Sequence, residues 1–334
     1  MKNLLFFAAL IVSGLTFAAC SVDDNIASEQ GESGKSAKCD IVLMYYGVGG
    51  MDLDYLTEDA IVNIVKNQEK YPNIRTFVQF KYSAKPLPEW KSFGYTASGE
   101  WGCTYRFEAN AATLNPMYKK DTNTARKPFL LTADMKKGVN TYKMYEAQNL
   151  ADYIKWYFKQ VPDAKVFVLA FGDHGAAYSI TTDYDKSKAA AQAPTRRGML
   201  YDDNIEDEPC MTPAEMATAI NAAGKKIDLV FFDCCMMNNL EVLGELQGTG
   251  LVDYAFASGH TVTASPLDML CDDLAKGYNK GNWVDGAKQY VYDIMDFMER
   301  QYLKDYDPLD LNKEIGTTPI GLLLSTKLPG GPNG

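Results

Sequence analysis

Two short apolar segments of this chain each stop on a side chain that can do chemistry. Lys165–Gly175, KVFVLAFGDHG, ends with His174 beside its final glycine, and Ile227–Cys235, IDLVFFDCC, ends on two cysteines. Apolar runs of this length and composition predict buried strands of the kind found in parallel sheets. Because open α/β sheets place their chemistry at the carboxyl ends of strands, an imidazole and a thiol could face each other there. That pairing is the cysteine–histidine dyad of nucleophilic catalysis.

The geometry of a strand leaves one choice open at the cysteines. Neighbouring residues point to opposite faces, so only one of Cys234 and Cys235 can face the site, and the other packs as a small hydrophobe. His260, the second of the chain's two histidines, also follows a predicted strand and is the rival base; we favour a place at the rim for it. With two histidines and no CxxC motif, we expect no structural zinc site and no metal at the dyad.

The amino-terminal residues predict export. Residues 1–19 join Lys2 to an apolar stretch that ends in small residues directly before Cys20, which is the pattern of a lipoprotein signal peptide acylated at that cysteine. The alternative is an ordinary signal peptide with a chance cysteine at the junction. Residues 20–38 are rich in Ser, Gly, Glu and Lys and predict a flexible tether. We therefore expect an exported lipoprotein of the outer membrane or cell surface, with a secreted form as the alternative.

Composition and element order predict one α/β domain over residues 39–334. Hydrophobic residues make up 46% of the 334, enough for a substantial core, and the net charge of −10 argues against nucleic acid and favours cationic substrates. Strand-like and helix-like segments alternate, which predicts a mainly parallel sheet between helical layers. The Gly/Pro-rich end suggested that a C-terminal part is missing. The expected strands are Cys39–Gly47, Ile74–Tyr82, Lys165–Gly175, Ile227–Cys235, Leu251–Gly259 and Ile320–Leu324, with an antiparallel hairpin over Trp90–Glu108. The expected helices begin near Thr57, Lys143, Thr212, Leu240 and Trp283.

The two motifs together resemble the clostripain family of caspase-like, clan CD cysteine peptidases. Asp173–Gly175 matches the family's Asp-His-Gly motif, and Phe232–Met237, FDCCMM, matches its Phe-Asp-Ala-Cys-Leu-Met motif. The resemblance implies a caspase-like three-layer fold. It also implies that Cys235 is the nucleophile, that His174 is its base, and that the backbone N–H groups of Gly175 and Cys235 stabilise the oxyanion.

The same resemblance implies the substrate. The family uses an aspartate two residues before the nucleophile to bind Arg or Lys at P1, the residue before the cut bond, and that position is Asp233 here. Asp268 is the candidate second carboxylate of this pocket. The expected partners are thus proteins or peptides with a basic P1 residue, and the membrane through the lipid anchor. Two alternatives stay open: a catalytically silent lipoprotein that acts as a binding module, and a related peptidase with another P1 preference.

The loop between the motifs predicts self-processing. Asp183–Arg197 is polar, rich in alanine and without an apolar face, so we expect an exposed loop. Clostripain-like enzymes cut themselves in this loop after a basic residue, and an acidic run follows it. We expect no cofactor, with calcium as the alternative because clostripain is associated with it; the run lacks EF-hand spacing and favours a solvated charge cluster. The candidate cleavage residues are Lys186, Lys188, Arg196 and Arg197. The acidic run consists of Asp202, Asp203, Glu206, Asp207 and Glu208.

Overall fold

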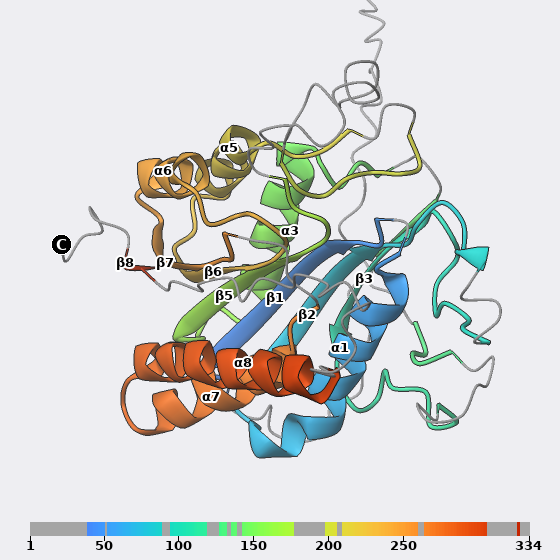
Figure 1. Ribbon diagram of the computed structural model, residues 1–334. Helices are drawn as coiled ribbons and strands as arrows, with labels where there is room; N and C mark the ends of the chain where they lie inside the picture. Colours follow the sequence, from blue (N-terminus) through green and yellow to red (C-terminus); the bar gives the residue numbers. More distant parts are fainter. Residues whose placement is uncertain are drawn as a thin grey trace, which may run out of the picture. The chain divides into compact units, whose positions relative to one another are not determined.

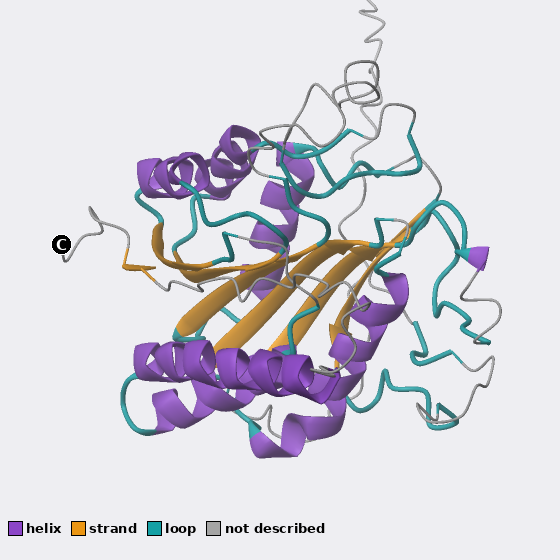
Figure 2. Cartoon of the chain, viewed as in Figure 1, coloured by secondary structure: helices purple, strands orange, loops and turns teal. Residues whose placement is uncertain are grey.

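A central sheet flanked by helices on both faces organises the chain from residue 39 onward (Figures 1 and 2). The computed structural model describes residues 39–50, 52–88, 94–118, 127–131, 135–138, 142–176, 198–205, 209–259, 264–305 and 326–327. The predicted signal peptide, Cys20 and the tether lie outside the described residues. Within the described part of the chain, no helix is long and apolar enough to cross a membrane.

The sheet has the strand order β4-β3-β2-β1-β5-β6-β7-β8, and its five central strands, β2 to β7 in that order, run parallel. Strands β3, β4 and β8 add antiparallel edges. The α/β class and the mainly parallel sheet are therefore confirmed. The strands are β1 (Ile41–Val48), β2 (Ile74–Lys81), β3 (Thr104–Ala109), β4 (Met135–Lys137), β5 (Val166–Gly172), β6 (Ile227–Asp233), β7 (Val252–Phe256) and β8 (Thr326–Lys327).

Two helical layers bury the two faces of the sheet. Helices α3, α5 and α6 pack on one face, and α1, α7 and α8 pack on the other (Figure 1). The central strands are apolar on both sides because both faces are covered, which is why they read as continuous apolar runs rather than alternating ones. The helices are α1 (Asp54–Asn67), α3 (Ala147–Gln160), α5 (Pro213–Ala223), α6 (Leu240–Thr249), α7 (Leu267–Asn279) and α8 (Trp283–Asp305).

Some of the predicted helix starts agree with the structure and others do not. The helix expected near Thr212 begins with a capping box: Thr212 Oγ1 accepts from the Glu215 backbone amide, the Glu215 side chain accepts from the Thr212 amide, and Pro213 begins α5. The helix expected near Thr57 begins earlier, at Asp54. Helix α7 was not predicted, because its first turn follows Pro266 without a capping side chain.

The predicted hairpin over Trp90–Glu108 is wrong. Strand β3 pairs instead with β2, with Tyr105 opposite Phe80, and with β4 on its other side. The described residues before β3 form turns rather than a strand, and Trp101 among them packs edge-to-face on Tyr82. The strand expected at Ile320–Leu324 lies outside the described residues.

Candidate active site

Strands β5 and β6 bring the two predicted motifs together at the carboxyl edge of the sheet. They are hydrogen-bonded neighbours, and Gly172 at the end of β5 is in register with Asp233 at the end of β6. One residue further, the Asp173 amide donates to the Asp233 carbonyl over 3.4 Å. His174 and Cys235 therefore leave the sheet from adjacent strands on the same edge, as the sequence predicted.

Gly175 lies directly against the backbone of Cys235. A Cβ atom at Gly175 would come 2.1 Å from the Cys235 carbonyl oxygen and 2.9 Å from its amide nitrogen. No side chain fits at such distances, so only glycine allows this approach. The backbone of the histidine turn thus reaches the cysteine turn, which brings two amide groups and a thiol into one small region.

The two adjacent cysteines differ in environment, as opposite faces of a strand end require. Cys234 is 1% exposed, lies against the Phe171 carbonyl at 3.5 Å, and has a pKa raised well above its usual range by burial. Cys235 is partly exposed. A thiol that must meet a substrate needs access to solvent and an accessible thiolate, so the structure favours Cys235 over Cys234.

The imidazole of His174 has two acceptors that sequence reasoning missed. Its Nε2 lies 2.8 Å from Asp52 Oδ1 and 3.1 Å from the Gly50 carbonyl oxygen. Because a carboxylate and a carbonyl both accept, this arrangement places the proton on Nε2 and leaves the basic lone pair on Nδ1. Gly50 and Asp52 follow β1, whose carboxyl end lies at the same edge, and that position was the available signal. The rival histidine, His260, lies outside the described residues.

Asp233 closes β6 with its carboxylate at the same edge. The Ser265 amide donates to its Oδ1 over 2.9 Å, and burial raises its pKa from 3.8 to about 6 despite that hydrogen bond. Its charge in turn raises the pKa of the buried phenols of Tyr45 and Tyr290, after burial itself.

Asp268, the second candidate for the pocket, contacts a residue of another helix. Its Oδ2 accepts from the Asn67 side chain over 3.0 Å. Asn67 is the last residue of α1, and Asp268 stands in the first turn of α7. The structure therefore uses this carboxylate in the contact between two helices, and its role in substrate binding stays a prediction.

The acidic run after the loop is not a solvated cluster in the part that the structure describes. Asp202 is fully buried in an ion pair with Lys81, whereas residues 206–208 lie outside the described residues. The described part of the chain holds no group of three or more His, Cys, Asp or Glu side chains arranged to bind a metal ion. The four candidate cleavage residues, Lys186, Lys188, Arg196 and Arg197, also lie outside the described residues.

Comparison with known structures found similar chains of low identity. Two are structures of a secreted C11 cysteine protease from Bacteroides thetaiotaomicron: one at 15% identity, with a TM-score of 0.46 over 72% of this chain and 58% of that one. The other, in complex with an irreversible peptide inhibitor, has 14% identity and a TM-score of 0.49 over 81% and 60%. An inactive zymogen C11 protease from Parabacteroides distasonis has 15% identity and a TM-score of 0.41 over 72% and 55%. This chain thus spans less than two thirds of the length of each.

A comparison with curated proteins found no match. The model of the clostripain family, Peptidase_C11, matches residues 111–304. This range covers more than half of the 334 residues and contains both the His174 turn and Cys235. The chain therefore belongs to the clostripain family of cysteine peptidases.

Proposed function

We propose that this protein is a cysteine endopeptidase that cleaves after Arg or Lys, with Cys235 as nucleophile and His174 as base. The observation that carries the proposal is the approach of Gly175 to Cys235, where a Cβ would meet the cysteine backbone at 2.1 Å. It supports a site in which the thiol, the imidazole and two backbone amides share one sheet edge. Membership of a peptidase family supports the reaction class.

The reaction needs only groups at this edge. His174 Nδ1 takes the thiol proton, and the thiolate of Cys235 attacks the carbonyl carbon of the scissile bond. Charge then develops on the carbonyl oxygen, where the amides of Gly175 and Cys235 stabilise it. The imidazolium gives its proton to the leaving amine, which departs and leaves a thioester. Water, deprotonated by His174, hydrolyses the thioester and restores the thiol.

Asp233 supports the preference for a basic P1 residue. It is the partly buried carboxylate two residues before Cys235, and the backbone amide of Ser265 donates to its Oδ1. A carboxylate accepts several hydrogen bonds, so it retains acceptor sites for a guanidinium or ammonium group. A cation in this position would also offset the cost of burying the carboxylate.

Fluorogenic peptides with Arg, Lys, Asn or Asp at P1 test the proposal, and the neighbouring cysteines provide a matched pair of variants. We expect turnover of the Arg or Lys peptide, abolished in Cys235→Ala and His174→Ala by at least ~10³-fold. Cys234→Ala should keep most of the activity because that thiol is buried. A dead Cys234→Ala with an active Cys235→Ala would reverse the assignment. Turnover of none of the four peptides would favour a silent binding module instead.

The proposal includes self-cleavage between Asp183 and Gly198. A loop that carries basic residues beside a site specific for them would block that site and be its first substrate. Mass spectrometry of the purified protein should show two chains that stay associated, and a single chain in Cys235→Ala. Simultaneous replacement of all four candidates by alanine should leave one chain of low activity. Cleavage that persists in purified Cys235→Ala would exclude self-processing.

Export and lipid anchoring at Cys20 complete the proposal. They rest on the residues of the signal peptide alone, Met1–Cys20. Expression of the full chain in a bacterium that processes lipoproteins should give a protein that partitions with detergent. Cys20→Ala should move it to the aqueous phase, and equal partitioning of the two would exclude the anchor.

A further inference from the structure

A fully buried ion pair lies close to the candidate active site. Lys81 Nζ and Asp202 Oδ2 are 2.6 Å apart, and both side chains are 0% exposed. Lys81 ends β2, and Asp202 belongs to residues 198–205, the post-loop segment, with which the described chain resumes after the loop. Removing two charges from water has a desolvation cost that mutual attraction offsets only when further hydrogen bonds are made. A pair in this place therefore needs a physical explanation.

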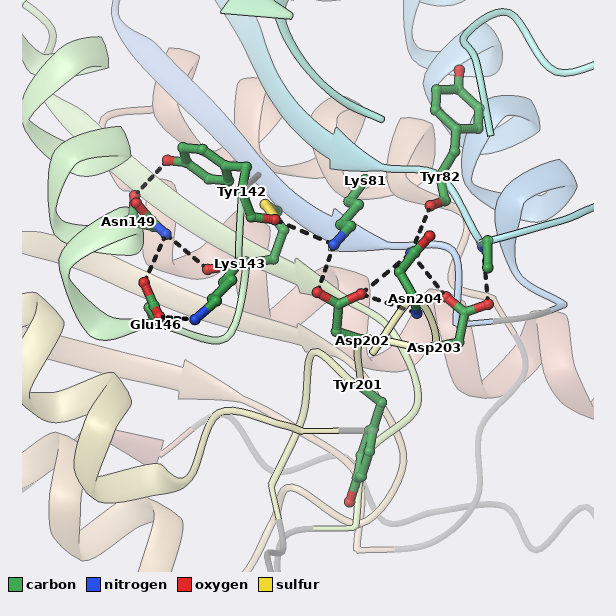
Figure 3. Close-up of polar contacts among 12 residues, drawn as sticks. Lys81, Tyr82, Tyr142, Lys143, Glu146, Asn149, Tyr201, Asp202, Asp203 and Asn204 are labelled. Atoms are coloured by element: carbon green, nitrogen blue, oxygen red, sulfur yellow. Dashed lines mark hydrogen bonds and ion pairs between the residues drawn. The ribbon is translucent and has the colours of Figure 1, made fainter. Parts of the chain in front are cut away.

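The further hydrogen bonds tie three segments together (Figure 3). Lys81 Nζ also donates to the carbonyl of Tyr142, which precedes α3, over 3.2 Å. Asp202 Oδ1 accepts from the backbone amide and the side-chain amide of Asn204, each over 3.2 Å. Asn204 in turn donates to the carbonyl of Tyr82 over 3.4 Å. The pair thus fixes the post-loop segment to the end of β2 and to the start of the α3 region.

The post-loop segment also holds both sides of the histidine turn. The Tyr201 amide donates to Asp173 Oδ2 over 2.5 Å, directly before His174. After the histidine, Gly175 forms an antiparallel bridge with Met199. The Ala176 amide donates to the carbonyl of Gly198 over 2.9 Å. The turn that carries the imidazole therefore rests against the segment that Asp202 anchors.

A chain of contacts also links the post-loop segment to the loop that holds His174. From the post-loop segment, Asp203 Oδ2 accepts from the Ala84 amide over 3.0 Å. Next to it, the Ser83 amide donates to Asp54 Oδ1 over 2.9 Å, at the start of α1. The residues just before α1 hold the imidazole Nε2 itself. The loop before α1 thus holds the imidazole, and the post-loop segment holds the turn that carries it.

We propose that Lys81 and Asp202 are positioning residues of the active site. Their ion pair anchors the post-loop segment, and the segment fixes the His174 turn and Gly175 relative to Cys235. The inference rests on the proposed peptidase function. It also explains how a chain cut in the loop keeps its site: the new amino-terminal part of the second chain stays bound to the first through the buried pair.

Hydrogen exchange tests the anchor without any need for activity. Asp202→Asn, made in a Cys235→Ala background to prevent self-cleavage, should raise exchange in peptides that contain the Met199 and Tyr201 amides by at least ~10-fold. The matched control is Asp253→Asn, which removes the same charge from a pair with Lys226, 2.7 Å apart and 52% and 21% exposed. It should leave these peptides unchanged. Wild-type exchange in a folded Asp202→Asn protein would overturn the inference.

Kinetics tests the link to the site. In the active protein, Asp202→Asn should lower kcat per titrated active site by ~10- to 100-fold, the cost of displacing a catalytic group by about an ångström. KM for a basic peptide should stay within about threefold, because the variant leaves the Asp233 pocket intact. A purely structural role would reduce the titrated fraction and leave kcat per site unchanged, which would overturn the inference.

A double variant keeps both tests open if Asp202→Asn does not fold. Lys81→Met with Asp202→Leu removes both charges, and apolar replacements of a buried pair are commonly neutral for stability. We expect a folded protein with raised exchange at Tyr201 and a low kcat per site. Wild-type exchange or wild-type kcat in this double variant would show that the pair only fills space. A wild-type protein without turnover would refute the proposed function, and the exchange result would still decide the anchor.

Discussion

Ion pairs at the two ends of the parallel strands differ in how much water reaches them. At the amino ends of the strands, which we call the amino edge, Lys226 and Asp253 pair across the starts of β6 and β7 and are 52% and 21% exposed. At the carboxyl edge, Lys81 and Asp202 pair at 0% exposure. Exposed pairs of the first kind contribute roughly 0–1 kcal/mol to stability, whereas breaking a buried pair costs about 3–5 kcal/mol. Breaking the Lys81–Asp202 pair should therefore cost more stability than breaking the Lys226–Asp253 pair.

Several buried carboxyl groups near the carboxyl edge have raised pKa values. Burial is the first cause that raises the pKa of Asp54 to about 7, of Glu58 to about 7, and of Asp173 well above its ordinary range. Each shift means that the folded state disfavours the ionised form. An edge optimised for stability alone would avoid such groups. Asp173 directly precedes His174, and its hydrogen bond from the Tyr201 amide helps to fix the turn that carries the imidazole.

The largest effect should come from the closest backbone approach at this edge. Gly175→Ala would place a Cβ 2.1 Å from the Cys235 carbonyl, so one of the two turns must move. Displacement of the nucleophile together with an oxyanion donor should lower kcat by at least ~10³-fold. Stopped assays on the Arg peptide measure this loss.

The control for that variant is a glycine with open space around it. Gly244 lies in α6, and a Cβ there would meet no atom within 4 Å. Gly244→Ala should keep activity and raise the free energy of unfolding by about 0.5–1 kcal/mol, because alanine loses less entropy in a helix. Equal activity of Gly175→Ala and Gly244→Ala would contradict the proposed contact between the two turns.

The next largest effect concerns the pocket carboxylate. Asp233→Asn should lower kcat/KM for Arg and Lys peptides roughly 10²-fold, since losing the partner of a buried charge costs about 2–5 kcal/mol. A norleucine peptide of similar length should lose much less. Equal losses for the Arg and norleucine peptides would show that Asp233 has a structural role, as the acceptor of the Ser265 amide.

The same residue predicts a pH-dependent preference. With a pKa raised to about 6, the Asp233 carboxylate is ionised above that pH and neutral below it. The ratio of kcat/KM for Arg over norleucine should therefore be high at pH 8 and fall as the pH drops through 6. In Asp233→Asn the ratio should be low and independent of pH. The ratio cancels the titration of the dyad, which acts on both peptides alike.

A smaller effect concerns how stability depends on pH through the buried carboxyl group of Glu58. Glu58 accepts from Tyr82, Tyr95 and the Ser98 amide, yet burial raises its pKa from 4.5 to about 7. The folded state thus holds a proton that the unfolded chain has released, so this stabilisation is full below pH 4.5 and lost as the pH rises through 7.

Glu58→Gln tests that sign. Glutamine does not titrate, so the fall in stability between pH 4.5 and 7 should be smaller in the variant, by an amount on the order of 3 kcal/mol in the free energy of unfolding. Urea denaturation at several pH values measures it. Parallel curves for wild type and variant would mean that the carboxylate ionises in the fold as it does in the open chain.

The sequence predicted the parts of this site that lie on regular elements. His174 and Cys235 end apolar runs, and apolar runs that are long enough become buried parallel strands whatever the loops do. Strand alternation predicts that Cys234 and Cys235 differ in environment, and the structure confirms this difference, with one thiol buried and one partly exposed. Their roles, which the resemblance assigned, stay a proposal. The capping box of Thr212 was equally local and is present.

The parts that could not be predicted are contacts between distant segments. Lys81 ends an apolar strand, where a lysine ordinarily reaches solvent, and its partner lies 121 positions along the chain. Asp202 stood in an acidic run that favours solvent. Only the fold, which lays the post-loop segment over the end of β2, removes both from water. Asp268 has a contact of the same distant kind: its Oδ2 accepts from the Asn67 side chain where α7 packs on α1, and its place in the pocket stays a prediction.

The smallest effect should come from the exposed charge of Asp52 at the carboxyl edge. Asp52 is 53% exposed, and its Oδ1 is 2.8 Å from His174 Nε2, while the Gly50 carbonyl accepts from the same nitrogen at 3.1 Å. Asp52→Asn keeps an acceptor oxygen and leaves the Gly50 contact, so the imidazole should keep its tautomer. Because solvent screens this pair, the melting temperature should change by less than about 2 °C, and kcat should fall by only ~3- to 10-fold. Asp52→Ala, which lacks the acceptor, should lose more than Asp52→Asn. A loss as large as that of His174→Ala would mean that the exposed carboxylate of Asp52, and not the contacts of the post-loop segment, holds the base.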